Sequence, residues 1–310
     1  MDRQNLAVDL GPLNLKNPVM AASGTFGYGE EYSGIIPLGS LGAIITKGLS
    51  LQPRKGNPPP RLAETPAGML NAIGLENVGL EIFLREKMPF LRRVRCPVLV
   101  NIFGSTAKEY AEMARRLAEV EGIAGLEINI SCPNLKKGGV IFASEPKSVH
   151  QVVSKIRRAT SFFIMVKLSP NVADIVQIAL AAEEAGADAV SLINTLTGLA
   201  IDVRTRMPIL GNITGGLSGP AIKPIGLRMV WQVAQAVHIP IVGIGGIVTA
   251  EDALEYIIAG ATAVQVGSAH FIDPRASLRI IDGIQSYLKA NEIPNIAPLV
   301  GSLKTKRDLS

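Results

Sequence analysis

Eight short apolar segments of strand character recur along the 310-residue chain and alternate with helical patterns. This alternation constrains the fold more than any other feature of the sequence. The segments are 19–22, 43–46, 98–100, 125–128, 162–166, 189–193, 241–244 and 263–266. Because they are apolar at almost every position, both faces of the sheet must be covered. That is typical of a parallel sheet flanked by helices.

Helix start signals stand between these segments. Thr106 followed three residues later by Glu109 has the pattern of a capping box. Thr249 and Asp252 repeat that pattern further along the chain. Asn171 precedes a run of apolar residues at helical spacing, and we expect it to cap that helix. The chain therefore predicts an α/β fold of repeated strand–helix units.

A closed barrel accounts for these units better than an open, doubly wound sheet, which stays the alternative. The helix-to-strand turn at 185–190 has a close echo at 259–264. Equivalent turns of this kind, and eight units in 310 residues, fit a (β/α)₈ TIM barrel. We expect residues 1–310 to form one domain of this kind.

Three segments lie outside the repeating pattern. Residues 8–15 have the pattern of a small N-terminal hairpin. The connections 48–92 and 195–222 are rich in Gly and Pro and too long for plain crossovers. We expect both of them to form loop excursions over the C-terminal mouth of the barrel.

Composition excludes several classes of protein. Aromatic residues make up 5% of the chain and the net charge of +5 is dispersed, so nucleic-acid binding is not expected. No apolar run approaches the roughly 20 residues that span a bilayer, and the first residues have no signal pattern. With two cysteines and no disulfide framework, we expect a cytoplasmic protein without a membrane segment. The three histidines have no metal spacing, so no metal site is predicted.

Polar residues follow five of the predicted strands, where the active sites of such barrels lie. They are Lys47, Asn101, Asn129, Lys167 and Asn194. A single Asn at a strand end is usually a turn former, but five polar residues at one mouth favour a binding site. An Asn amide offers a donor beside an acceptor, which suits the edge of a pyrimidine or flavin ring. The lysines would neutralise a substrate carboxylate or the charge on a reduced flavin.

Glycine-rich turns follow the last two strands. Gly245-Gly246 comes after the seventh strand and Gly267-Ser268 after the eighth, and 215–219 could add a third wall. In these barrels the corresponding loops commonly hold a phosphate through backbone N–H groups. No strand–GxGxxG–helix unit is present. The combination therefore favours FMN over a dinucleotide.

Cys132 follows the fourth strand on a loop. Pro133 disfavours a helical conformation at Cys132 and indicates an extended loop over the mouth. Most free cysteines are buried and inert, which is how we interpret Cys96. For Cys132 the neighbouring Asn129 and Asn134 favour catalysis, because the mouth offers no other base and nearby lysines would lower the pKa of a thiol.

Several of these motifs, in order along nearly the whole chain, resemble the dihydroorotate dehydrogenases. They are Asn71-Ala-Ile-Gly-Leu-Glu-Asn77, Asn129-Ile-Ser-Cys-Pro-Asn134, Lys167-Leu-Ser-Pro170, Asn194-Thr195 and Gly215-Gly-Leu-Ser-Gly219. The resemblance implies that Cys132 removes a proton from C5 of dihydroorotate while a hydride passes from C6 to N5 of FMN. The product is orotate, an intermediate of de novo pyrimidine biosynthesis.

The resemblance also implies two sets of binding residues. Those expected to hold the substrate are Lys47, Asn71, Ala72, Ile73, Gly74, Leu75, Asn129, Asn134, Asn194 and Thr195. Those expected to hold FMN are Ser23, Lys47, Gly48, Asn101, Asn129, Lys167, Ile193, Gly219, Gly245, Gly246, Gly267 and Ser268.

Within the family, residues 131–140 are similar to the NAD-linked class 1B rather than to the fumarate-using class. That class implies a homodimer core in a heterotetramer with a subunit that carries FAD and an iron–sulfur cluster. A cluster usually needs four cysteine ligands and this chain has two, so it cannot supply that relay alone. Val78 and Ala143 depart from residues that relatives often have, and both flank the motifs.

Other functions stay open at this point. Another FMN barrel, such as a tRNA dihydrouridine synthase or the flavin domain of a dihydropyrimidine dehydrogenase, would show a basic face or further cysteine clusters, and neither is visible. A flavin-free barrel that binds a phosphorylated metabolite, as an isomerase or a binding protein, would be colourless when purified.

Overall fold

A closed barrel of eight parallel strands forms the centre of the computed structural model, which describes residues 5–130 and 145–305. Around the barrel the strands are β3 (Val19–Ala21), β4 (Ala43–Ile45), β7 (Val98–Ile102), β8 (Gly125–Asn129), β9 (Phe163–Lys167), β10 (Ala189–Leu192), β15 (Ile241–Ile244) and β16 (Ala263–Val266). The eighth strand pairs with the first, with Val264 opposite Val19. The barrel predicted from the alternation is confirmed.

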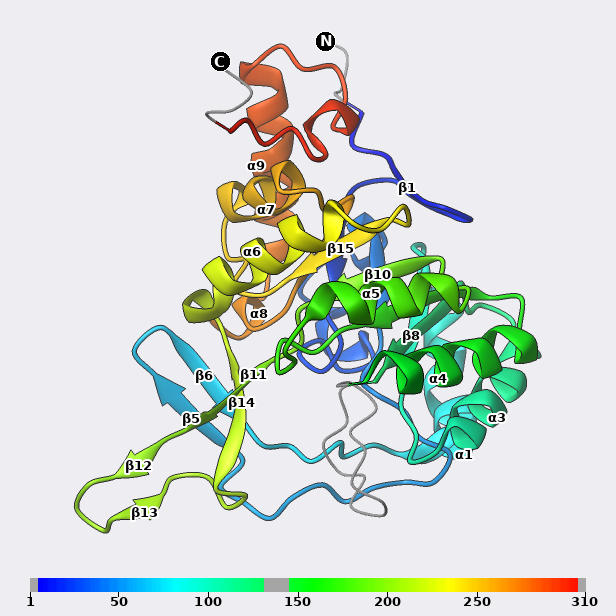
Figure 1. Cartoon of the computed structure of the whole chain (residues 1–310), viewed down its shortest axis with the longest axis vertical. Helices are drawn as coiled ribbons and strands as arrows, with labels where there is room; N and C mark the ends of the chain where they lie inside the picture. Colours follow the sequence, from blue (N-terminus) through cyan, green and yellow to red (C-terminus); the bar gives the residue numbers. More distant parts are fainter. Residues whose placement is uncertain (1–4, 131–144, 306–310) are drawn as a thin grey trace.

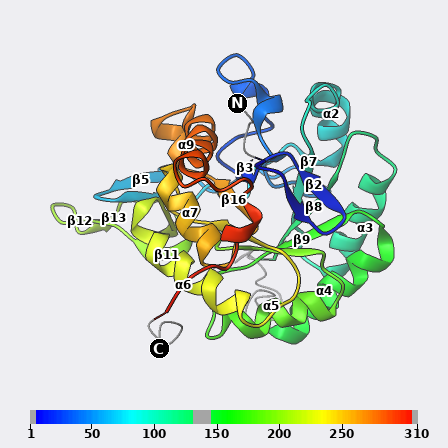
Figure 2. The ribbon, with the colours of Figure 1, turned by 90° about the horizontal axis from the view of Figure 1, so that it is seen from above.

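Helices cover the outside of the barrel (Figures 1 and 2). The longer ones are α3 (Ala107–Ala118), α4 (Pro146–Ala159), α5 (Ile175–Glu184), α6 (Lys223–Ala234), α7 (Ala250–Ile258) and α9 (Ala276–Ala290). The short helices are α1 (Gly79–Ile82), α2 (Met88–Leu91) and α8 (Ala269–Ile272), with a π-helical turn at Phe83–Lys87 between the first two. Leu117, Val153 and Ile257 are fully buried on their inner faces. None of the described helices is long and apolar enough to cross a membrane.

Two of the three predicted helix caps are confirmed. The Thr106 hydroxyl accepts a hydrogen bond from the Glu109 N–H, but the Glu109 carboxylate accepts from the N–H of Ser105 rather than that of Thr106, so this cap is not a reciprocal box. Thr249 and Asp252 do form a reciprocal capping box. The cap expected at Asn171 is wrong. Helix α5 begins at Ile175 because the Asp174 carboxylate accepts hydrogen bonds from the next turn, and a carboxylate there also favours the positive end of the helix.

The predicted N-terminal hairpin is present. Strands β1 (Val8–Leu10) and β2 (Leu13–Leu15) pair antiparallel. Leu10 and Leu15 are buried and belong to the main hydrophobic core. Figure 2 shows the hairpin in front of the barrel strands, over the end of the barrel that faces the viewer.

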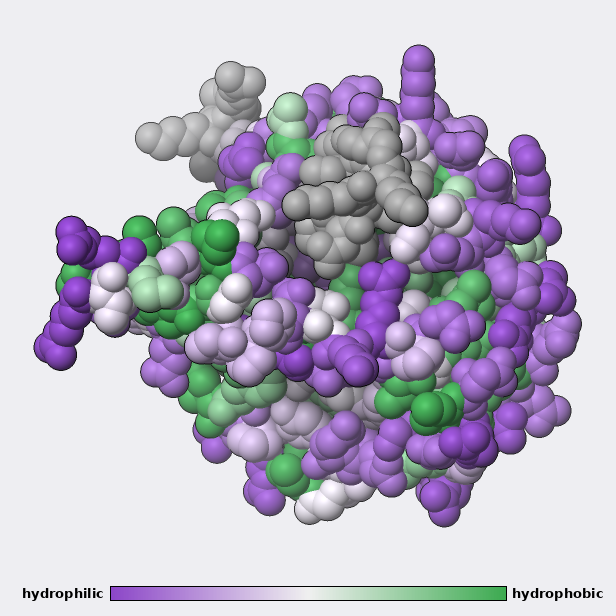
Figure 3. Space-filling view, turned by 90° about the horizontal axis from the view of Figure 1, so that it is seen from below, coloured by the Kyte–Doolittle hydropathy of each residue, from purple (hydrophilic) through white to green (hydrophobic). Residues whose placement is uncertain are grey.

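The two long excursions join into one projecting antiparallel sheet, in the order β11-β14-β6-β5 (Figure 1). Its strands are β5 (Leu62–Thr65), β6 (Gly68–Asn71), β11 (Leu196–Leu199) and β14 (Thr214–Ser218), and a small ribbon of β12 (Ile201–Asp202) and β13 (Met207–Pro208) extends it. Val203 and Met207 are exposed on this projection, which lies at the left of Figure 3. The sequence predicted the excursions but not their pairing.

Truncating a buried side chain of β7 is expected to destabilise the barrel. Leu99 is fully buried, so Leu99→Ala should lower the free energy of unfolding by about 3 kcal/mol through lost burial and the cavity left behind. Leu199→Ala, on the half-exposed side chain of β11, is the matched control and should change it by less than about 0.5 kcal/mol. Urea denaturation measures both, and equal effects would contradict the assignment of Leu99 to the core.

Candidate active site

A pocket opens at the carboxyl ends of the barrel strands. It encloses about 530 Å³ of empty space, open solvent included. Ten residues predicted from the sequence line it: Ser23, Lys167, Ile193, Asn194, Thr195, Gly219, Gly245, Gly246, Gly267 and Ser268. Of the six other lining residues, Ser218 belongs to the predicted third wall 215–219, and Ile244 and Ile247 flank the predicted turn at Gly245–Gly246. Ala22, Thr25 and Ile222 were not expected from the sequence.

One wall of the pocket is the turn after β15. Gly246 has a φ of 69°, and a Cβ there would lie 2.8 Å from the Cβ of Lys223 and 2.9 Å from the carbonyl oxygen of Gly219. Only glycine fits such a position without a shift of the backbone. The Tyr256 hydroxyl donates a 2.7 Å hydrogen bond to the carbonyl of Gly245 and fixes the turn from behind. The turn is thus a close-fitting backbone surface, as a phosphate cradle requires.

The five polar residues expected at the strand ends do lie at this end of the barrel. Asn129 and Lys167 are the last residues of β8 and β9. Lys47 and Asn194 come two residues beyond β4 and β10. Asn101 lies within β7 rather than after it, which corrects the predicted strand end.

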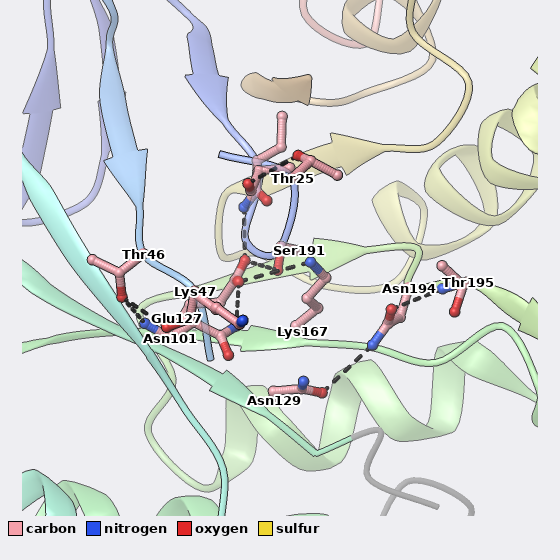
Figure 4. A network of polar contacts seen from close by, with 12 residues as sticks. Thr25, Thr46, Lys47, Asn101, Glu127, Asn129, Lys167, Ser191, Asn194 and Thr195 are labelled. Atoms are coloured by element: carbon pink, nitrogen blue, oxygen red, sulfur yellow. Dashed lines mark hydrogen bonds and ion pairs between the residues drawn. The ribbon is translucent and has the colours of Figure 1, made fainter. Parts of the chain in front are cut away.

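Side chains from different strands meet across the mouth (Figure 4). The Asn194 amide nitrogen lies 3.5 Å from the Asn129 amide oxygen, and the Asn194 oxygen accepts a 2.8 Å hydrogen bond from the N–H of Thr195. Three of the residues expected to hold a substrate are therefore adjacent, although Asn129 ends β8 and Asn194 and Thr195 belong to the loop after β10.

The predicted loop 71–75 does not line the pocket itself, but the projecting sheet brings it close. Asn71 ends β6, and its side-chain amide donates a 3.2 Å hydrogen bond to the carbonyl of Gly216 in β14. Gly216 in turn leaves no room for a Cβ against the Thr195 side chain. Asn71 therefore contacts Gly216, which in turn packs against Thr195, a residue that lines the pocket. Of its neighbours, Ala72 is buried and Gly74 has a φ of 76°.

A buried polar cluster lies inside the barrel and was not predicted. The Glu127 carboxylate is fully buried and accepts hydrogen bonds from Asn101 at 2.6 Å, Ser191 at 3.0 Å and Gln265 at 2.7 Å. Its other neighbour is the Lys167 ammonium, 3.8 Å away. A sequence signal was available, since a polar residue interrupts the apolar runs of β8, β10 and β16 at 127, 191 and 265.

The residues present fit FMN on two observations. The Asn101 side-chain oxygen is buried without a hydrogen-bond partner and lies 3.0 Å from where a Cβ of Gly48 would stand. A buried acceptor of this kind calls for an N–H donor, which a flavin ring supplies. The pocket also combines Gly-rich turns with the ammonium of Lys167. In the described residues no cluster of His, Cys, Asp or Glu could hold a metal ion.

Of the two cysteines, Cys96 is among the residues that the structure describes. Cys132 and Asn134 lie outside the described residues. Cys96 precedes β7 at the opposite end of the barrel and is half-buried rather than buried. Burial raises the pKa of its thiol to about 11, so it carries no thiolate at neutral pH. The interpretation of Cys96 as inert agrees with this environment.

Comparisons with known proteins give one family. The family model for dihydroorotate dehydrogenase matches residues 5–288. The chain is 57% identical over 305 residues to the "Dihydroorotate dehydrogenase B (NAD(+)), catalytic subunit" of Geotalea uraniireducens, covering 98% of this chain and all of the relative. It is 59% identical over 304 residues to the proteins of the same description from Geotalea daltonii and Geobacter metallireducens, with the same coverage.

A solved structure gives the same fold. The crystal structure of DHODH from Eimeria tenella in complex with ferulenol matches with a TM-score of 0.78, covering 96% of this chain and 88% of that one. At 23% sequence identity this likeness concerns the fold.

A buried histidine beside the second glycine turn is expected to make stability depend on pH. His270 in α8 is 1% exposed, and its ring nitrogens lie 3.2 Å from the Gly267 carbonyl and 2.9 Å from the Ser277 hydroxyl. Burial lowers the pKa of His270 to about 4, and the hydrogen bond to Gly267 only partly opposes this. In the unfolded chain the ring takes up a proton near pH 6.5.

The unfolded chain therefore binds the extra proton between about pH 6.5 and 4. The free energy of unfolding should fall as the pH is lowered through this range, by up to about 3 kcal/mol from this residue. Urea denaturation between pH 4.5 and 7 should show a shallower pH dependence in His270→Gln than in the unsubstituted protein. His238→Asn, at an exposed position, should keep the full dependence. The same slope in His270→Gln would refute the assignment.

Proposed function

The chain belongs to the dihydroorotate dehydrogenase family, and we propose that it is the catalytic subunit of an NAD-linked, class 1B enzyme of de novo pyrimidine biosynthesis. Its reaction is the oxidation of dihydroorotate to orotate with FMN as the bound cofactor. One observation carries this proposal: a glycine-walled pocket and a set of Asn and Lys side chains meet at a single barrel mouth, in a chain 57–59% identical to such subunits.

We propose that residues 1–310 form a single FMN-binding domain. The turns with Gly219, Gly245–Gly246 and Gly267–Ser268 would hold the phosphate through their N–H groups. Ser23, Lys47, Gly48, Asn101, Asn129, Lys167 and Ile193 would surround the ring. The side-chain oxygen of Asn101 would accept a hydrogen bond from the ring, which satisfies that otherwise unpartnered atom.

The substrate would lie between the ring and the loops over the mouth. Asn71, Asn129, Asn134, Asn194 and Thr195 offer amide and hydroxyl groups that pair with the C=O and N–H groups of a pyrimidine-dione. The loop 72–75 would add main-chain contacts. Lys47 would face the substrate carboxylate, which a cationic side chain can neutralise.

Cys132 would act as the general base. As a thiolate it removes the proton from C5 of dihydroorotate, and the double bond forms between C5 and C6 as the hydride leaves C6. Bound FMN supplies the hydride acceptor for this step. Lys167, which ends β9 and lines the pocket, would stabilise the negative charge that develops on the reduced ring.

We propose that the electrons then pass to NAD⁺ through a partner subunit with FAD and an iron–sulfur cluster, which associates with a homodimer of this chain. The name of the relatives, a catalytic subunit of an NAD⁺ enzyme, supports this. The chain has two cysteines, fewer than the four that such a cluster usually needs.

Anaerobic mixing with dihydroorotate tests the reaction. We expect the purified yellow protein to lose its visible flavin absorbance when dihydroorotate is added, because the hydride moves to FMN. Orotate serves as the control and should leave the colour unchanged. Fumarate added to the bleached protein should not restore the colour; if it does, the subclass is wrong. A yellow protein that dihydroorotate fails to bleach would refute the reaction.

Replacing the thiol tests the base. Cys132→Ser should slow the reduction of FMN by dihydroorotate by about 100-fold or more, since a positioned base typically contributes about 10²–10⁴ in rate. FMN content should not change. Cys96→Ser, at the opposite end of the barrel, is the matched control and should reduce at the unsubstituted rate. Stopped-flow absorbance measures both, and equal rates in Cys132→Ser and Cys96→Ser would rule out the role of Cys132.

A further inference from the structure

The buried Glu127 carboxylate lies directly behind two groups expected to contact FMN. Glu127 is in β8, Asn101 in β7 and Lys167 in β9, and Figure 4 shows the three side chains converging inside the barrel. Glu127 is fully buried, and Asn101 and Lys167 are 1% and 6% exposed. Of these three residues only Lys167 lines the pocket, so Glu127 can act on a ligand only through its neighbours.

The carboxylate fixes which way the Asn101 amide faces. An ionised carboxylate only accepts hydrogen bonds, so the amide nitrogen of Asn101 must face Glu127, at 2.6 Å. The amide oxygen is then turned away, toward Gly48, as a buried acceptor without a partner. If the amide were reversed, its oxygen would face a carboxylate oxygen of Glu127. Its nitrogen would then point toward Gly48, as a donor in place of the acceptor.

The carboxylate also sets the charge balance at Lys167. The Glu127 oxygen lies 3.8 Å from the ammonium, and no other ion pair of Lys167 occurs in residues 5–130 and 145–305. At this distance and degree of burial, solvent screens the pair little. A cation beside a reduced flavin favours the reduced form, and an anion behind the cation weakens that effect.

We propose that Glu127 is a positioning residue that holds Asn101 as an acceptor for FMN and, by opposing the charge of Lys167, lowers the midpoint potential of the bound flavin. The proposal rests on the proposed FMN site. Ser191 and Gln265 complete the hydrogen bonds of the carboxylate on its other oxygen, which keeps it in place. Without them a buried charge would be left poorly compensated.

Glu127→Gln tests the proposal, because it keeps the size of the side chain and removes its charge. The new amide can still accept at one oxygen from Ser191 and Gln265. Its nitrogen would face Asn101, so Asn101 must reverse and present a donor where it presented an acceptor. Oxidised FMN should therefore bind about tenfold more weakly. Reduced FMN should bind about as before, because the unopposed charge of Lys167 compensates.

Binding and reduction of the flavin form a thermodynamic cycle. If oxidised FMN binds tenfold more weakly while the binding of reduced FMN is unchanged, the midpoint potential of the bound two-electron couple becomes about 30 mV more positive. Redox titration against a dye of known potential measures the shift, and fluorescence of FMN titrated with flavin-free protein measures the affinity. Neither readout depends on turnover.

Two further variants separate this role from a merely structural one. Ser191→Ala removes one hydrogen bond to the same carboxylate and keeps the charge, so the potential should not change. Glu127→Asp keeps the charge but draws it back from Lys167, so the potential should rise by less than in Glu127→Gln. This variant decides the question if Glu127→Gln does not fold.

An unchanged or lower potential in Glu127→Gln, or the same rise in Ser191→Ala, would overturn the proposal. These outcomes are distinct from failure of the proposed function. If dihydroorotate bleaches the protein but the midpoint potential is unchanged in Glu127→Gln, only the role of Glu127 is contradicted. A protein that binds FMN and shows the shift, yet is not bleached, contradicts only the reaction.

Discussion

Closure of the barrel is the constraint on which the other features of the molecule depend. Because β16 pairs with β3, all eight strands run in one direction around a ring and their carboxyl ends face the same mouth. Closure also creates an interior that side chains must fill. Here the filling is partly polar: Gln265 of β16 donates to Glu127 of β8, four strands away and so on the opposite side of the ring. A buried carboxylate is costly unless it is fully paired, and this one meets three donors and an ammonium.

Local patterns were sufficient for the barrel but not for everything attached to it. The strands at 241–244 and 263–266 have the predicted bounds, since unbroken apolar runs in a parallel sheet begin and end at turn residues. The projecting sheet could not be predicted, because the pairing of β6 with β14 that joins its two halves brings together residues about 145 apart, such as Asn71 and Gly216. Because Asp174 caps helix α5, Asn171 does not. Its amide instead donates to the carbonyl of Thr195 and accepts from the N–H of Thr197.

The site residues that follow strands or lie in glycine turns could be predicted from the sequence. The polar residues inside the barrel could not. Lys167, Asn194 and the turn at Gly245–Gly246 were identified from their positions after strands, and the structure brings them into one pocket. Glu127, Ser191 and Gln265 were not identified, because each is a single polar residue within an apolar run. Only the fold shows that they face one another. Through the Glu127 carboxylate this cluster contacts two of the polar residues at the mouth, with a hydrogen bond from Asn101 and an ion pair with Lys167.

Under the proposed function, this mouth recognises a flavin by both its ring and its phosphate. The most direct test compares two ligands that differ only in the phosphate. Flavin-free protein is titrated with FMN and with riboflavin, and the quenching of flavin fluorescence is followed. If the glycine turns hold the phosphate, FMN binds one per chain and riboflavin binds about 100-fold more weakly or worse, since charge-assisted hydrogen bonds are lost. Equal affinity for the two ligands, or no binding of either, would contradict this mode of flavin binding.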